Sequence, residues 1–64
     1  MAKGYKENEQ AFGVGDIAKW QNLYVVKIVE VLQGENNNYL YEIRTIEFVK
    51  PIVRLVKQKE LEMI

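Results

Sequence analysis

The sequence predicts an all-β protein, a single small barrel of about five short strands that follows a flexible N-terminal arm. Residues 23–32, LYVVKIVEVL, are rich in the β-branched side chains that favour strands. Stretches rich in Gly and Asn separate this segment from other short apolar runs, which is typical of small all-β domains. Because 64 residues suffice for one domain, we expect the arm over residues 1–11 and the domain over residues 12–64.

The expected strands follow one another closely along the chain. Residues 12–16 contain two glycines suited to a turn and lead into a first strand over residues 17–20. The second strand, residues 23–32, is mostly apolar on both faces. It therefore either lies centrally with both faces covered or bends so that its two halves serve different sheets. Residues 33–38 predict a hairpin turn, and residues 39–46 alternate as a half-buried third strand does.

Alternation along the second strand predicts which of its side chains are buried. Strict period-2 geometry places Ile28 on the same face as Glu30, and Val29 on the same face as Val31. We expect Ile28 in the core. The opposite face, if exposed, offers a surface for self-association.

The segment around Pro51 has two interpretations. Residues 48–56 predict a fourth strand, with Pro51 at an edge or a bulge because proline cannot donate a ladder hydrogen bond. The alternative is a helix from Pro51, because proline suits a first helical turn and the apolar residues after it are helically spaced. Their β-branched side chains favour the strand. Residues 57–60 then predict a short turn, and residues 61–64 a closing strand.

The composition excludes several classes of protein. Hydrophobic residues make up 48% of the chain, so a packed core is expected. Lys and Arg number 9, as do Asp and Glu, so no strong field attracts a phosphate backbone. No apolar run approaches the roughly 18 residues of a membrane span, and the N-terminus lacks the apolar centre of a signal peptide. We expect no membrane segment and a cytoplasmic location.

Catalysis and metal binding are not expected. The chain has no Ser, Cys or His, so the usual nucleophiles and the usual base near neutral pH are missing. Without Cys and His there is neither a disulfide framework nor a zinc cluster. The remaining carboxylate pairs, Glu7 with Glu9 and Glu60 with Glu62, lack the spacing of a calcium loop. We therefore expect no enzyme, no metal and no cofactor.

Three stretches carry a family resemblance: VGDIAKW, YVVKIVEVL followed by a turn and YLYEIR, and VRLVKQKELEMI. A Gly-Asp pair opens the first strand, a bulky aromatic closes it, and a Glu-Leu turn precedes the last strand. This pattern resembles the SH3-like barrels of the Tudor, chromo-like and KOW types over residues 12–64. The Tudor resemblance implies an aromatic cage for methylated side chains at Trp20 and Tyr24, with Tyr39 or Phe48 contributing. The KOW resemblance implies that basic residues contact RNA or a ribosomal or polymerase partner.

Two sets of residues are candidate binding sites. The first comprises four aromatics that we expect around one end of the barrel, where exposed rings bind partners and buried rings are core: Trp20, Tyr24, Tyr39 and Tyr41. The second is a basic rim suited to nucleic acid: Arg44, Lys50, Arg54, Lys57 and Lys59. Because three glutamates lie among these cations, a solvated face of mixed charge is the alternative interpretation.

The predicted function is therefore binding. We expect a non-catalytic protein- or peptide-binding module, a small stand-alone modulator or inhibitor that docks on a larger protein, as phages and mobile elements often encode. The alternative is a nucleic-acid-binding small barrel of the KOW or Tudor type. The zero net charge favours the first hypothesis.

Overall fold

The computed structural model describes residues 9–35, 38–46 and 49–64, and these residues form an all-β fold, as the sequence predicts. The elements, in chain order, are β1 (Ile17–Trp20), β2 (Tyr24–Gln33), β3 (Tyr39–Thr45), β4 (Val53–Lys57), a 3-10 helix (Gln58–Glu60) and β5 (Leu61–Met63). Parts of the expected arm, of the hairpin turn and of the fourth strand, including Phe48, lie outside the described residues.

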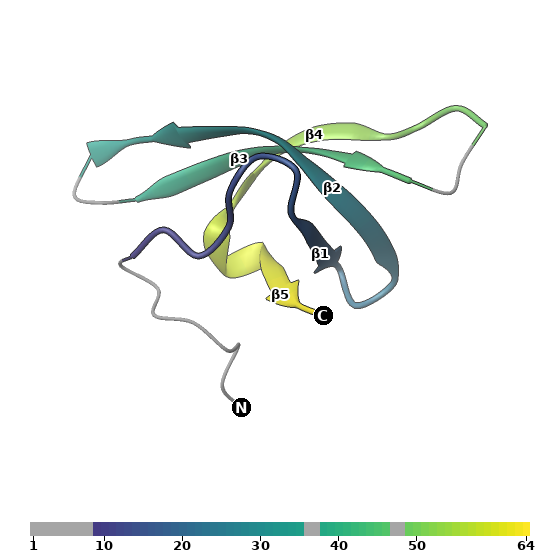
Figure 1. Cartoon of the computed structure of the whole chain (residues 1–64), viewed down its shortest axis with the longest axis horizontal. Helices are drawn as coiled ribbons and strands as arrows, with labels where there is room; N and C mark the ends of the chain where they lie inside the picture. The colour runs from purple at the N-terminus through teal and green to yellow at the C-terminus, as the bar shows by residue number, and fades with distance from the viewer. Residues whose placement is uncertain (1–8, 36–37, 47–48) are drawn as a thin grey trace.

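The five strands make one antiparallel sheet in the order β4-β3-β2-β1-β5. β4 and β5 are therefore its two edges, yet only the 3-10 helix separates them in the chain. This short connection brings the two edges near each other at one corner, so the sheet is strongly curled, although it is not closed. β1, β5 and the segment before β1 lie together on one side of the β2–β3–β4 sheet (Figure 1). This arrangement is compatible with a small barrel-like fold.

A β-bulge in β2 explains how one strand serves both halves of the sheet. Its register against β3 shifts between Ile28 and Glu30, leaving Val29 as the extra residue. Before the shift Ile28 is buried, and after it Val31 faces the buried Tyr41. The expected alternation therefore holds as far as Ile28 and reverses after it, because a bulge inserts one residue into the pleat. The strand is irregular at this bulge, as one of the two expected arrangements requires, but both of its halves belong to one sheet, in which it is the central strand.

The core lies between the curled halves of the sheet. The predicted burial of Ile28 is confirmed, since its side chain is completely buried. Phe12 contacts Tyr41 edge to face, with ring centroids 5.5 Å apart and an interplanar angle of 89°. The buried hydrophobic residues are Phe12, Ala18, Trp20, Val26, Ile28, Tyr41, Ile43, Val56 and Leu61. These side chains come from all five strands and from the segment before β1.

The fourth strand begins at Val53, after the proline instead of around it. Pro51 therefore removes no ladder hydrogen bond. The loop before the strand is closed by Thr45, whose backbone N–H donates to the Ile52 carbonyl at 3.0 Å and whose Oγ1 accepts from the Ile52 N–H at 2.8 Å. The helical alternative from Pro51 does not form, consistent with the β-branched residues that follow.

The hydrogen-bonded part of the chain starts earlier than the expected boundary at residue 12. Gln58 Nε2 donates to the carbonyl of Glu9 at 2.7 Å, and the Ala11 N–H donates to Gln58 Oε1 at 3.0 Å. Residues 9–11, assigned by the sequence to the flexible arm, are thus tied to the domain. The residue that makes these hydrogen bonds, Gln58, is buried and lies near the other end of the chain.

Candidate functional site

Trp20 and Tyr24 lie at the hairpin that joins β1 to β2. They are cross-strand partners, and their ring centroids are 5.5 Å apart with the rings tilted by 34°. Tyr24 is half-buried, whereas Trp20 is only 6% exposed. The indole Nε1 of Trp20 is buried without a hydrogen-bond partner among the described residues. Trp20 is therefore part of the core, and its ring presents little surface to a partner.

The other two candidate aromatics lie at the far end of β2. Tyr39 pairs with Gln33 and Tyr41 pairs with Val31, whereas Tyr24 is the first residue of the same strand. Tyr41 is completely buried against Phe12, and Tyr39 is half-buried. The structure consequently does not gather the four rings at one end. It places them in two pairs, each with one buried and one half-buried ring.

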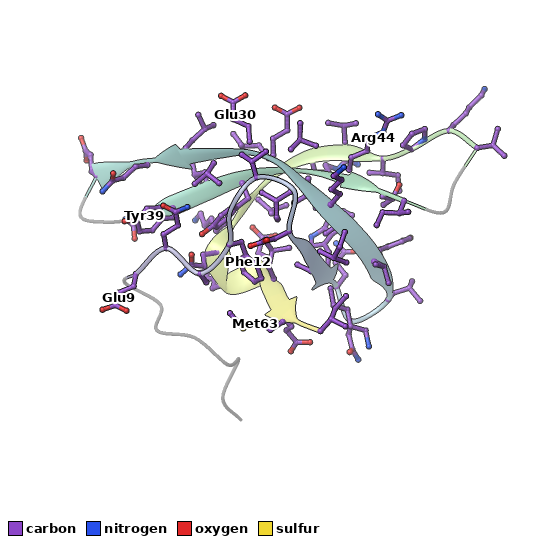
Figure 2. All side chains as sticks on the ribbon, in the orientation of Figure 1. Glu9, Phe12, Glu30, Tyr39, Arg44 and Met63 are labelled. Atoms are coloured by element: carbon purple, nitrogen blue, oxygen red, sulfur yellow. The ribbon has the colours of Figure 1, made fainter. Side chains whose placement is uncertain are left out.

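Tyr39 lines a cleft of about 470 Å³ between the hairpin turn and the 3-10 helix. Two of the predicted cations, Lys57 and Lys59, also line the cleft. Its walls are formed by Gly34, Glu35, Asn38, Tyr39, Leu40, Lys57, Gln58 and Lys59. Figure 2 shows Tyr39 at this end of the molecule, on the same side as Glu9. This cleft is the candidate functional site, because a predicted aromatic and predicted cations meet there.

The fold of the 3-10 helix explains how the two lysines reach the cleft. Gln58 points inward and is buried by its bonds to the segment before β1, so its neighbours Lys57 and Lys59 are turned to the exposed side. The Glu60 carboxylate caps the helix by accepting from the Lys57 N–H at 2.8 Å. Gln58 thus fixes the backbone from which both lysine side chains extend. Sequence reasoning missed this role, for which the one available signal is an uncharged residue inside the charged run KQKE.

The opposite wall of the cleft is a tight turn. The Gly34 N–H donates to the Asn38 carbonyl at 2.6 Å, and the Asn38 N–H donates to the Glu35 carbonyl at 3.0 Å. A Cβ at Gly34 would approach the Asn38 carbonyl oxygen to 3.2 Å, so glycine permits this close approach. Glu35 brings one negative charge to the cleft, against two positive charges from the lysines.

The five predicted cations do not form one rim. Lys57 and Lys59 share the cleft, but Arg44 lies on the opposite face of β3 from the core, in a second hollow of about 300 Å³. Arg54 is exposed on the edge strand opposite Ile43, and Lys50 is exposed in the loop before β4. Only two of the five predicted cations therefore line the same cleft.

The pKa of one residue near the cleft is clearly perturbed. Burial raises the pKa of the Tyr41 phenol above its ordinary value of 10.0, while hydrogen bonds with the backbone of Phe12 and Ala11 partly oppose the change. The phenol therefore stays protonated, and its hydroxyl donates a hydrogen bond to Gln58 Oε1. Tyr41 therefore supports the cleft by holding the side chain of Gln58, the residue between the two lysines.

Comparison of the chain with protein-family models, with curated proteins and with solved structures gave no match. Within residues 9–35, 38–46 and 49–64, no three acidic side chains come together in a way that would hold a metal ion. The same residues include no helix with the length and apolar content needed to cross a membrane.

Proposed function

We propose that this protein is a non-catalytic binding module that docks on a larger protein through the cleft at Tyr39, Lys57 and Lys59. The observation that carries this proposal is one concave site whose lining includes the half-buried Tyr39 and two exposed lysines, Lys57 and Lys59. Tyrosine is enriched among residues that dominate binding energy, because it offers a large rigid contact area and a polar tip.

The lining of the cleft defines the chemistry of the partner. Lys57 and Lys59 attract carboxylates, and the single opposing charge at Glu35 leaves the site net positive. The side chains of Tyr39 and Leu40 provide apolar contact. The occupant best suited to this site is a protein segment with an acidic side chain or terminal carboxylate next to an apolar one.

We further propose that the fold is a small SH3-like barrel. The strand order and the 3-10 helix between β4 and β5 support this assignment. A Tudor-type cage requires several rings around one ligand. Trp20 and Tyr24 lie at the opposite end of β2 from Tyr39, so this chain is a poor candidate for recognition of methylated side chains.

Nucleic-acid binding is the second candidate function. A tyrosine flanked by two lysines is also suited to stacking a base and contacting its phosphates. Against it, Arg44 and Arg54 point to other surfaces, and the chain has no net charge. The geometry therefore favours an acidic protein segment.

Affinity capture from cells of the source organism, with and without nuclease, tests the proposal. The wild-type protein is compared with the double variant Lys57→Glu, Lys59→Glu and with Arg54→Glu, a single charge reversal on β4 outside the cleft. We expect one protein to be retained by the wild type and by Arg54→Glu, to survive nuclease, and to be lost from the double variant. Recovery that depends on nucleic acid, or that is unchanged by the double variant, contradicts the proposal.

A further inference from the structure

The face of the β2–β3–β4 sheet that points away from the core is uncovered by the other described residues (Figure 1). Glu30 and Arg44 both project from this side, opposite to Phe12 and Met63 (Figure 2). We call this surface the outer face. Its residues are Lys27, Val29, Glu30, Leu32, Leu40, Glu42, Arg44, Val53, Leu55 and Lys57.

Two adjacent rows of cross-strand partners dominate the outer face. In the first row, Lys27 of β2 faces Arg44 of β3, which in turn faces Val53 of β4. In the second row, Glu30 faces Glu42, which faces Leu55, on the same three strands. The first row is therefore basic, basic and apolar, and the second is acidic, acidic and apolar.

Each row taken alone is unfavourable for the two strands that carry its charges. Like charges directly opposite one another destabilise an antiparallel pair, and the outer face contains two such pairs side by side. None of the four charged side chains forms an ion pair with another described residue. The bulge at Val29 creates the acidic pair, because it turns Glu30 outward to meet Glu42. Within one chain the acidic row lies beside the basic row, which offsets this repulsion in part, and a second copy laid over the face adds further opposite-charge contacts.

Each charge of the two rows meets an opposite charge when the outer face meets a second copy of itself. In a symmetric dimer, a two-fold axis running between the two rows and parallel to them lays each row over the other row of the second copy. Lys27 then lies over Glu30, Arg44 over Glu42, and Val53 over Leu55 of the second copy. Every contact becomes an opposite-charge or an apolar pair. Two sheets stacked in this way pack with nearly aligned strands about 10 Å apart.

We infer that the outer face associates with the outer face of a second copy of this chain. The apolar side chains support the inference, because Val53 is 50% exposed and Leu55 is 58% exposed beside the charged pairs. Three strands make a face only about 15 Å wide, so the dimer is weak and forms as the protein concentration rises. The two charged rows include none of the residues that line the binding cleft, although Leu40 and Lys57 of the outer face also line it.

Charge reversal on one chain tests this inference by analytical ultracentrifugation across a range of concentrations. Lys27→Glu removes two of the four ion pairs of the dimer and places a glutamate over Glu30 of the other copy in both positions. We therefore expect self-association to weaken at least about tenfold. Within one chain the same change places residue 27 opposite Arg44 but beside Glu30, so the melting temperature of the monomer should change little. Loss of the dimer is thereby distinguished from loss of the fold.

The double variant Lys27→Glu, Glu30→Lys restores opposite charges across the two-fold axis, and we expect it to recover self-association. Arg44→Glu with Glu42→Arg is an independent pair that repeats the test on β3, and Lys59→Glu is the control for the same charge change off the outer face. A wild-type protein that stays monomeric throughout overturns the inference. So does self-association unaffected by Lys27→Glu, or a double variant that does not recover.

Discussion

The phenolic hydroxyl of Tyr41 donates a hydrogen bond to Oε1 of Gln58, and both side chains are buried. The same oxygen accepts from the Ala11 N–H, and the Gln58 amide donates to the Glu9 carbonyl. One glutamine therefore joins β3, the 3-10 helix and the segment before β1. This network holds Lys57 and Lys59 at the cleft, so fold and candidate site depend on the same residue.

Replacing Gln58 should destabilise the protein strongly. Gln58→Ala leaves the Tyr41 hydroxyl, the Ala11 N–H and the Glu9 carbonyl without this partner, so we expect a loss of about 2–4 kcal/mol in the free energy of unfolding. Urea unfolding measures it, with the exposed neighbour Lys59→Ala as the control. A change in Gln58→Ala no larger than that of the control would show that the network contributes little.

Stability should fall at alkaline pH because of Tyr41. Burial raises the pKa of its phenol, so as the pH passes 10.0 the unfolded chain loses this proton while the folded protein still retains it. The stabilisation that comes from the raised pKa of Tyr41 is complete below pH 10.0 and is lost as the pH rises through the pKa of this phenol in the folded protein. We expect urea midpoints between about pH 9 and 11 to fall less steeply in Tyr41→Phe than in the wild type. Parallel curves would argue against a raised pKa.

Replacing Trp20 should lower the stability of the fold. Because its ring is 6% exposed, Trp20→Ala should cost about 3–5 kcal/mol of stability. Trp20→Phe should cost clearly less, because phenylalanine fills much of the space and leaves no buried N–H without a partner. Thermal melting of the two variants measures these losses and distinguishes a buried ring from one at the surface. A Trp20→Ala protein that melts near the wild-type temperature would place the ring at the surface after all.

The hairpin between β1 and β2 is a place where the protein can be stabilised. Gln21 and Asn22 have φ angles of 57° and 54°, in the left-handed region that side chains other than Gly, Asn and Asp disfavour. The double variant Gln21→Asn, Asn22→Gly supplies the residues that this turn prefers, so it should raise the free energy of unfolding by about 1 kcal/mol. Chemical denaturation checks this, and an unchanged or lower midpoint would contradict the turn geometry.

The sequence predicted local features well and the site poorly. The β-branched run of β2 and the turn residues around it determined the all-β class and the number of strands, because both signals are local. The face assignment failed beyond Ile28, because a bulge depends on pairing with another strand. The cleft was missed for a similar reason, since Tyr39 and Lys59 meet only through the burial of Gln58.

Site-specific photo-crosslinking in cells of the source organism tests the proposed binding cleft most directly. A benzophenone side chain at position 39 lies in the cleft, whereas one in place of Leu23, which is 71% exposed at the other end of β2, serves as the control. We predict that position 39 forms a covalent adduct with one larger protein, that position 23 does not, and that the adduct disappears when Lys57 and Lys59 are replaced by glutamate. An adduct with nucleic acid at position 39, or equal crosslinking from positions 39 and 23, would contradict docking through this cleft.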